Sequence, residues 1–286
     1  MSSITRKIWI TGASSGIGEA LVKELANDDT EIWISSRSLT KLTSIAEGLP
    51  GKVHPLPIDL SQYECVEQLK QTFENQVLDQ IYLIAGGCEY VDFPDFDSRM
   101  LGRIMNQNYM SHAYAIEAAL PSLRQSVRPW IVGMSSSVAW TGLPRSEAYG
   151  SSKAAIYYLM ESLRVDLWGK MDVSVICPGF VETPLTDLND FPMPGRITSE
   201  AAAQRIARAS LSRPFEIHFP KRFTYFLKFL SILPQWLKDR LKQGMRQKPP
   251  EVKPQEVKPN EVKPNNVKLN EVNPNEPELS QTRGVE

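Results

Sequence analysis

Cysteine is scarce in this sequence: its 286 residues include only Cys65, Cys88 and Cys177, with no Cys-x-x-Cys pair. Such a small, odd set excludes a disulfide framework and gives no support for a zinc site. The three histidines are equally dispersed, so we expect no bound metal. The cysteine content is that of a protein kept in a reducing compartment.

Long apolar runs and an excess of charge of one sign are absent as well. No apolar run reaches the length of about 18 residues that a membrane-spanning helix needs, and the N-terminus lacks a signal-peptide pattern. The 33 acidic side chains nearly balance the 32 basic ones, whereas a general nucleic-acid-binding domain is strongly basic. We therefore expect a cytoplasmic protein that binds no nucleic acid.

Proline is unevenly distributed, with 7 of the 21 prolines in residues 249–286, where no aromatic residue occurs. A five-residue unit repeats there, and the copies that begin at Glu251, Glu256 and Glu261 are nearly identical. Proline in almost every unit prevents helix formation, and one valine per unit cannot build a core. We predict a disordered tail at 249–286 and interpret it as a spacer rather than a docking segment.

Short apolar runs alternate with helical patterns along the first 220 residues. The runs that predict strands are 7–10, 31–35, 53–58, 81–85, 130–134, 173–177 and 215–219. Long helices are predicted at 97–120 and 147–168. Apolar strands separated by helices are typical of a parallel sheet covered on both faces. The sequence therefore predicts an α/β fold with a doubly wound, Rossmann-type sheet of about seven parallel strands.

A glycine-rich turn separates the first predicted strand from the first predicted helix. Its members are Thr11, Gly12, Ala13, Ser14, Ser15, Gly16, Ile17 and Gly18. Gly12 permits a tight turn, Gly16 lets the backbone approach a diphosphate, and Gly18 allows close packing of helix and strand. The N–H groups at the start of the helix would face the anion. This context favours a dinucleotide-binding turn over a purely structural one.

Tyr149 and Lys153 are four residues apart in a predicted helix, so their side chains share one face. A free tyrosine has a pKa of about 10, and a nearby Lys153 ammonium with an oxidised nicotinamide ring would favour the phenolate. Tyr149 would then act as general acid toward a carbonyl oxygen, or as general base in reverse. Alone, the pair could be an exposed helical pair, but the glycine turn precedes it in this chain.

With TGxxxGxG at 11–18 and YxxxK at 149–153, the chain resembles the short-chain dehydrogenase/reductase family in its compact, single-domain branch. The resemblance runs from about residue 7 to 219 and implies a catalytic domain at 1–222. It implies an NADP(H)-dependent carbonyl reductase or alcohol dehydrogenase, which moves hydride between nicotinamide and a carbon atom of a small-molecule substrate. A non-catalytic NADP(H)-binding redox sensor is the alternative.

The resemblance implies two further catalytic residues. The family places a serine 13 residues before the tyrosine, which gives Ser136, whereas alignment of the Ser-Val-Ala string gives Ser137. We favour Ser136, whose hydroxyl would orient the substrate oxygen. Asn108 matches the family asparagine that holds a proton-relay water on a long helix, with Asn106 as the nearby alternative.

Positions after the third and fourth predicted strands match family contacts with the cofactor. Asp59 would bond the adenine amino group, although an aspartate before a helix also suits an N-cap. Ala85 and Gly86 match the end of the family string Asn-Asn-Ala-Gly, in which Ile84 replaces an asparagine. Because that asparagine usually braces the central sheet, its loss alters local hydrogen bonding more than catalysis.

The choice between NADP and NAD depends on the end of the second strand. The family's NAD-preferring members carry an acidic residue near Ser36, whereas Arg37 can bind a 2′-phosphate bidentately, so we expect NADP rather than NAD. After the sixth strand, Pro178, Gly179 and Thr183 match the family's Pro-Gly…Thr element. That turn would bring the backbone against the nicotinamide, and Thr183 would bond its carboxamide or the diphosphate.

Two segments beyond these motifs bear on the substrate and on partners. The loop Leu185–Ile197 occupies the family's variable lid, and its apolar residues, with Trp140 and Leu143, favour an apolar carbonyl or alcohol. Residues 223–248 form a predicted amphipathic extension, in which two short helices flank Pro234. Residues 221–248 hold 8 basic side chains and one acidic. The extension would contact an anionic membrane surface, or pack against the substrate cleft or a second subunit of a homodimer.

Overall fold

The computed structural model describes residues 5–243 of the chain. The predicted tail at 249–286 and the end of the predicted extension, 244–248, lie outside the described residues. No helix within the described part is both long and apolar enough to cross a membrane.

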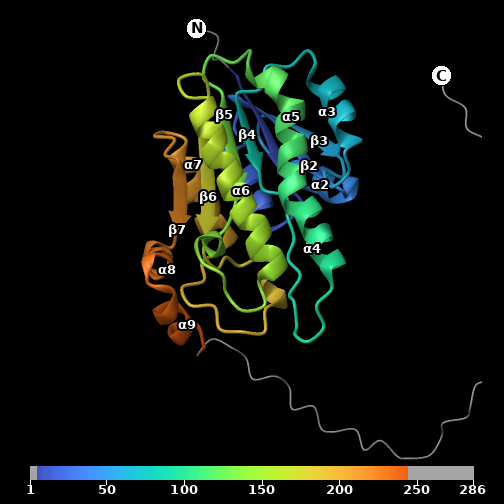
Figure 1. The fold of residues 1–286 in the computed structure, drawn as a ribbon. Helices are drawn as coiled ribbons and strands as arrows, with labels where there is room; N and C mark the ends of the chain where they lie inside the picture. The colour runs from blue at the N-terminus through green and yellow to red at the C-terminus, as the bar shows by residue number, and fades with distance from the viewer. Residues whose placement is uncertain (1–4, 244–286) are drawn as a thin grey trace, which may run out of the picture. The chain divides into compact units, whose positions relative to one another are not determined.

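Seven parallel strands form one sheet (Figure 1). They are β1 (Arg6–Thr11), β2 (Thr30–Ser36), β3 (Lys52–Pro57), β4 (Gln80–Leu83), β5 (Trp130–Met134), β6 (Asp172–Pro178) and β7 (Glu216–Phe219). Their order across the sheet is β3-β2-β1-β4-β5-β6-β7, which reverses direction between β1 and β4. The central strands β1, β4, β5 and β6 are almost wholly buried, as their continuous apolar runs require. The predicted doubly wound α/β fold is confirmed.

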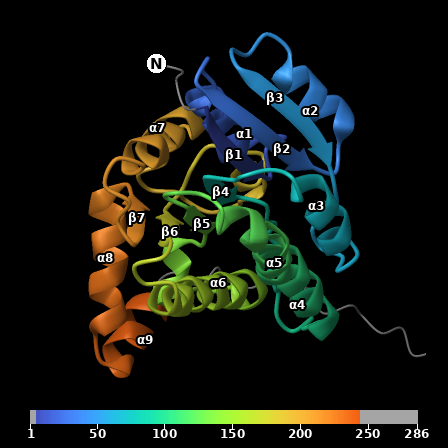
Figure 2. The same cartoon turned by 90° about the horizontal axis from the view of Figure 1, so that it is seen from above.

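Helices cover both faces of the sheet. They are α1 (Gly16–Leu25), α2 (Leu39–Ala46), α3 (Cys65–Phe73), α4 (Ser98–Met105), α5 (Ser111–Leu123), α6 (Glu147–Asp166), α7 (Ser199–Ala209), α8 (Lys221–Ile232) and α9 (Gln235–Gln243). Residues of α1, α2 and α7 share one core cluster, and residues of α3, α5 and α6 share another. Figure 2 shows α5 and α6 on one face of the sheet and α7 on the other.

The predicted long helix at 97–120 is present as a continuous helical stretch over 98–123. It contains a π-helical turn, Asn106–Met110, between α4 and α5, which the sequence did not predict. The reason lies outside the segment: Asn108 is buried in the turn and its amide bonds a loop and a neighbouring helix. Such π-turns often occur at functional sites, and this one points Asn108 toward the carboxyl ends of β4 and β5.

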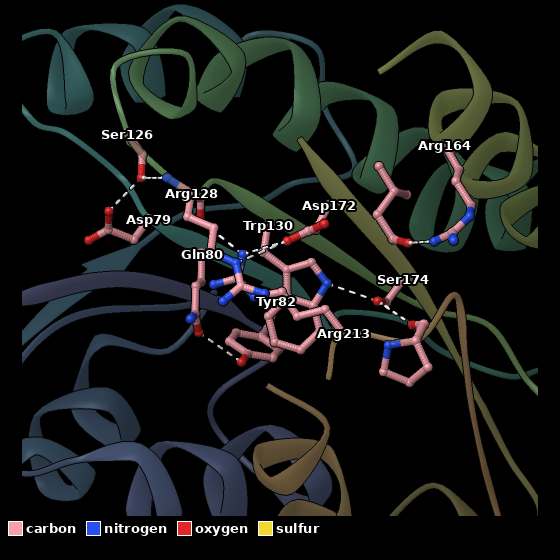
Figure 3. A network of polar contacts seen from close by, with 12 residues as sticks. Asp79, Gln80, Tyr82, Ser126, Arg128, Trp130, Arg164, Asp172, Ser174 and Arg213 are labelled. Atoms are coloured by element: carbon pink, nitrogen blue, oxygen red, sulfur yellow. Dashed lines mark hydrogen bonds and ion pairs between the residues drawn. The ribbon is translucent and has the colours of Figure 1, made fainter. Parts of the chain in front are cut away.

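A polar network joins the amino ends of β4, β5 and β6, at the end of the sheet opposite the carboxyl ends of the strands (Figure 3). Arg213 donates to the carbonyl of Arg128 at 2.9 Å and to Asp172 at 2.8 Å, and its guanidinium lies 5.1 Å from the Trp130 ring centroid. The Trp130 indole donates in turn to Ser174 at 2.8 Å. These bonds hold the amino ends of the strands together and lie away from their carboxyl ends.

The helices α8 and α9 flank Pro234, as predicted. Thr224, Leu227 and Leu230 form the buried face of α8, which packs against β7 and the 3₁₀ turn Ser137–Trp140. Lys242 of α9 donates to Thr141 at 2.7 Å. The inner face of α8 therefore packs against its own chain. The sequence analysis had considered packing against the substrate cleft or a second subunit.

Candidate functional site

A cavity of about 720 Å³ lies at the carboxyl ends of the strands. In a doubly wound sheet, ligands bind there, beside the point where the strand order reverses. The residues predicted to bind the cofactor line this cavity, from the glycine turn after β1 to Thr183 after β6; of the turn, only Thr11 and Ala13 do not. The roles of these residues stay predictions, but the fold brings them to one place.

The glycine turn forms a cradle that larger residues would fill. Gly12 and Gly16 adopt positive φ angles of 66° and 55°, which favour glycine. A Cβ atom at Gly18 would lie 2.2 Å from the Gly12 carbonyl oxygen, and one at Gly16 would lie 2.8 Å from Thr183. The Ser15 side chain makes no capping bond at the start of α1, so its hydroxyl does not occupy the helix N–H groups. This cradle fits a diphosphate.

Thr11 braces the loop after β4, in which Ile84 stands at the position of the family's asparagine. Its hydroxyl accepts hydrogen bonds from the backbone N–H groups of Ile84 at 3.0 Å and Ala85 at 3.2 Å. A Cβ atom at Gly12 would lie 2.7 Å from the Ala85 nitrogen, so the two loops touch. The effect of the missing asparagine on local hydrogen bonding stays a prediction.

Tyr149 and Lys153 project from α6 into the cavity, and Ser136 lies beside them. The Ser136 side chain is close enough to Tyr149 to lower the pKa of its phenol. The Lys153 ammonium donates to the Met134 carbonyl at 2.9 Å and lies 5.6 Å from the centroid of the Tyr149 ring. Ser137, the alternative serine, is buried at the start of the following 3₁₀ turn.

Burial dominates the electrostatics of this pair. It raises the pKa of Tyr149 above its ordinary value, the nearby Cys88 thiol adds to the rise, and the Ser136 side chain opposes it. Burial also lowers the pKa of Lys153 to about 8. Tyr149 is therefore the neutral phenol here, the form that donates a proton, and the shift toward the phenolate beside an oxidised nicotinamide stays a prediction.

Asn108 is fully buried behind the cavity wall. Its amide nitrogen donates to the Gly87 carbonyl at 3.0 Å and to Ser152 at 2.8 Å, and its oxygen accepts from the Gly87 N–H at 2.7 Å. A Cβ atom at Gly86 would lie 2.9 Å from the Asn108 oxygen and 3.3 Å from the Lys153 nitrogen. Asn108 and Lys153 therefore meet at Gly86, whereas Asn106 is exposed on the rim.

The opposite end of the cavity is basic. Arg37 is exposed there, and Lys41 from the first turn of α2 lines the same wall. The sequence analysis missed Lys41, although its position four residues after Arg37 was a usable signal. Asp59 also lines this end and accepts from the Ser61 N–H at 3.0 Å. Because Glu64 is the N-cap of α3, the alternative capping role for Asp59 is wrong.

The loop Leu185–Ile197 is held over the substrate side by contacts that the sequence did not show. Arg145 donates to Asp92 at 2.6 Å and to Asp190 of the loop at 2.7 Å. Tyr90 hydrogen-bonds Asn189 and packs edge-on against Phe191, with the ring centroids 5.9 Å apart. The partners are distant in sequence, so no local signal could have found them.

Trp140 does not take the place that the sequence analysis gave it beside the substrate. Its ring packs against α8 and β7, with the Lys228 ammonium 4.9 Å from its centroid and the His218 ring 6.1 Å away. The prediction of a pocket-lining tryptophan is therefore wrong, because the C-terminal helix covers this side chain.

Comparison with known proteins agrees with this fold. The family pattern described as "short chain dehydrogenase" matches residues 6–190. An uncharacterized oxidoreductase of Myxococcus xanthus is 29% identical over 247 residues, 84% of this chain and 98% of that protein. 11-beta-hydroxysteroid dehydrogenase 1A of Arabidopsis thaliana is 33% identical over 198 residues, 66% of this chain but only 56% of that protein.

Solved structures of low identity share the fold. A short chain dehydrogenase from Burkholderia cenocepacia J2315 in complex with NADP superposes with a TM-score of 0.71 at 22% identity, covering 84% of this chain and 99% of that one. An alcohol dehydrogenase from Thermococcus sibiricus complexed with 5-hydroxy-NADP gives 0.67 at 23% identity, covering 75% and 95%.

Proposed function

This chain belongs to the short-chain dehydrogenase family of oxidoreductases, and from that premise we propose that it reduces an apolar carbonyl compound, or oxidises the matching alcohol, with NADP(H). The convergence of Tyr149 and Lys153 on the cavity that the glycine cradle also lines carries the proposal. When bound, the nicotinamide supplies or accepts the hydride.

The chain's own residues hold and move the proton. Tyr149 keeps its proton and would donate it to the substrate oxygen as hydride arrives at the carbon, or take it back in the reverse direction. Ser136 would hold that oxygen in place. Lys153 would return a proton to Tyr149, and Asn108, which meets Lys153 at Gly86, would hold the water that relays it.

NADP is the proposed cofactor because two cations face the adenosine end of the cavity. Arg37 and Lys41 could both bind a 2′-phosphate, and no carboxylate stands at Ser36 to repel it. The solved relatives from Burkholderia and Thermococcus were crystallised with NADP and 5-hydroxy-NADP, in line with this assignment.

The substrate is proposed to be apolar. Aromatic rings continue from Tyr90 through Phe191 to Phe180, whose centroids are 5.9 Å and 6.0 Å apart in turn. These rings form an aromatic cluster at the loop Leu185–Ile197, which would give the substrate site an apolar side. The Arabidopsis relative's name, a hydroxysteroid dehydrogenase, is consistent with an apolar alcohol or ketone.

Oxidation of NADPH with a panel of apolar ketones tests the function. We expect turnover by the wild type, and a loss of at least about 1,000-fold in Tyr149→Phe with cofactor binding retained. Binding of NADPH without turnover across the panel would favour the redox sensor. Full activity in Tyr149→Phe would overturn the proposed role of the tyrosine.

A further inference from the structure

Within residues 5–243, α8 and α9 leave large apolar side chains exposed. Six large side chains there are between 47% and 79% exposed: Tyr225, Phe226, Phe229, Ile232, Trp236 and Leu241. The four that belong to α8 lie on the side of the helix opposite the buried Thr224, Leu227 and Leu230, so this helix carries apolar side chains on both sides. A surface helix ordinarily turns polar residues toward water, so this face needs an apolar partner.

The same segment is strongly basic. Residues 221–243 contain six Lys or Arg side chains and one acidic residue, Asp239. Within the described residues, Arg222, Lys238 and Arg240 make no ion pair, so their charges remain available. Exposed aromatic and aliphatic side chains beside free cations are typical of helices that lie in the interface of an anionic membrane.

We infer that α8 and α9 bind the surface of an anionic lipid membrane, with these six exposed side chains inserted among the headgroups. A second copy fits the face less well, because a two-fold contact would bring two such cationic segments together. In Figure 2, α8 lies beyond β7, at the edge of the described fold. The inference is independent of the proposed hydride transfer.

Cosedimentation of the full chain with vesicles tests this. We expect binding to phosphatidylcholine vesicles that contain about 30% phosphatidylserine and at least about tenfold weaker binding to phosphatidylcholine alone. Protein that remains in the supernatant with both kinds of vesicle would overturn the inference.

Two sets of variants separate the apolar face from the charges. Phe226→Gln/Phe229→Gln/Ile232→Gln should weaken binding at least about tenfold. Its matched control is Tyr158→Gln/Val165→Gln/Leu211→Gln, three side chains that are 71% to 81% exposed elsewhere and should leave binding unchanged. Equal loss in both sets would contradict the inference.

The charge variant Arg222→Gln/Arg240→Gln should lose about 30-fold on the anionic vesicles, since each cation near such a surface contributes about 1 kcal/mol. Arg124→Gln/Lys170→Gln, two exposed cations on other elements, is the control. Light scattering measures whether a second copy of the chain covers these side chains instead. If the apolar variant turns a dimer into a monomer, they form a subunit interface and the membrane inference is wrong.

Discussion

Phe223, in the first turn of α8, lies directly against Gly179 in the turn after β6: a Cβ atom at Gly179 would lie 2.7 Å from Cδ1 of the phenylalanine. The same ring packs on Phe180, with the centroids 5.3 Å apart. The C-terminal segment therefore supports the turn that the proposed function places against the nicotinamide.

Gly179→Ala should lower kcat/KM at least about tenfold, because the new methyl group overlaps the Phe223 ring and shifts the turn. Steady-state kinetics with the preferred ketone measure this. Phe223→Ala in the same background should recover part of the loss, since it removes the overlapping atoms. Additive losses in the double variant would contradict the proposed support.

Arg37→Ala should raise the Kd for NADP by about 10- to 100-fold and leave that for NAD unchanged, because a charge-assisted bond to the 2′-phosphate is lost. Lys41→Ala should act in the same direction. Calorimetry with both cofactors measures the shifts, and Lys52→Ala on β3, outside the cavity, is the control. Equal Kd values for the two cofactors in the wild type would defeat the assignment.

Ser136→Ala should lower kcat by about 100-fold or more, as expected for the removal of a hydroxyl that holds the reacting oxygen. Ser137→Ala should change kcat by less than about threefold, because that hydroxyl lies inside the 3₁₀ turn. Single-turnover reduction separates chemistry from product release. The reverse order of effects would assign the role to Ser137.

The reaction should slow above a pH of about 8, where Lys153 loses its proton. Burial lowers its pKa, so the ammonium is present below that pH and is lost above it, together with its positive charge beside Tyr149. A pH profile of kcat from 6 to about 10 shows the alkaline limb. In Lys153→Met, the limb should vanish and kcat should fall throughout; an alkaline limb that persists in this variant would argue against the lysine.

Acid should destabilise the protein through His218. Burial, reinforced by Lys221 and Lys228, lowers its pKa to about 4, below the ordinary 6.5. The unfolded chain therefore takes up the proton first, and stability is lost as the pH falls from about 6.5 toward 4. Urea unfolding at pH 7 and 5 should show a loss of about 2 kcal/mol that His218→Gln reduces. An identical pH dependence in that variant would exclude the histidine as the cause.

The sequence predicted the sheet well because its signals are local. Each central strand is a continuous apolar run, and the turn Thr11–Gly18 carries its conformational demands in its own glycines. The same holds for Tyr149 and Lys153, whose fixed separation of four residues puts them on one face of α6. Residues that act together with neighbours in sequence can therefore be recognised from the amino-acid sequence alone.

Tertiary structure decided what depends on neighbours distant in the chain. The π-turn at Asn108 exists because Gly87 and Ser152, from two other elements, bind its amide. Trp140 left the predicted pocket because α8 covers it, and Lys41 joined Arg37 because α2 turns its first residues toward the cavity. Hydrophobic periodicity determines which residues are buried, but it carries no record of which surface buries them, and only packing in three dimensions supplies that.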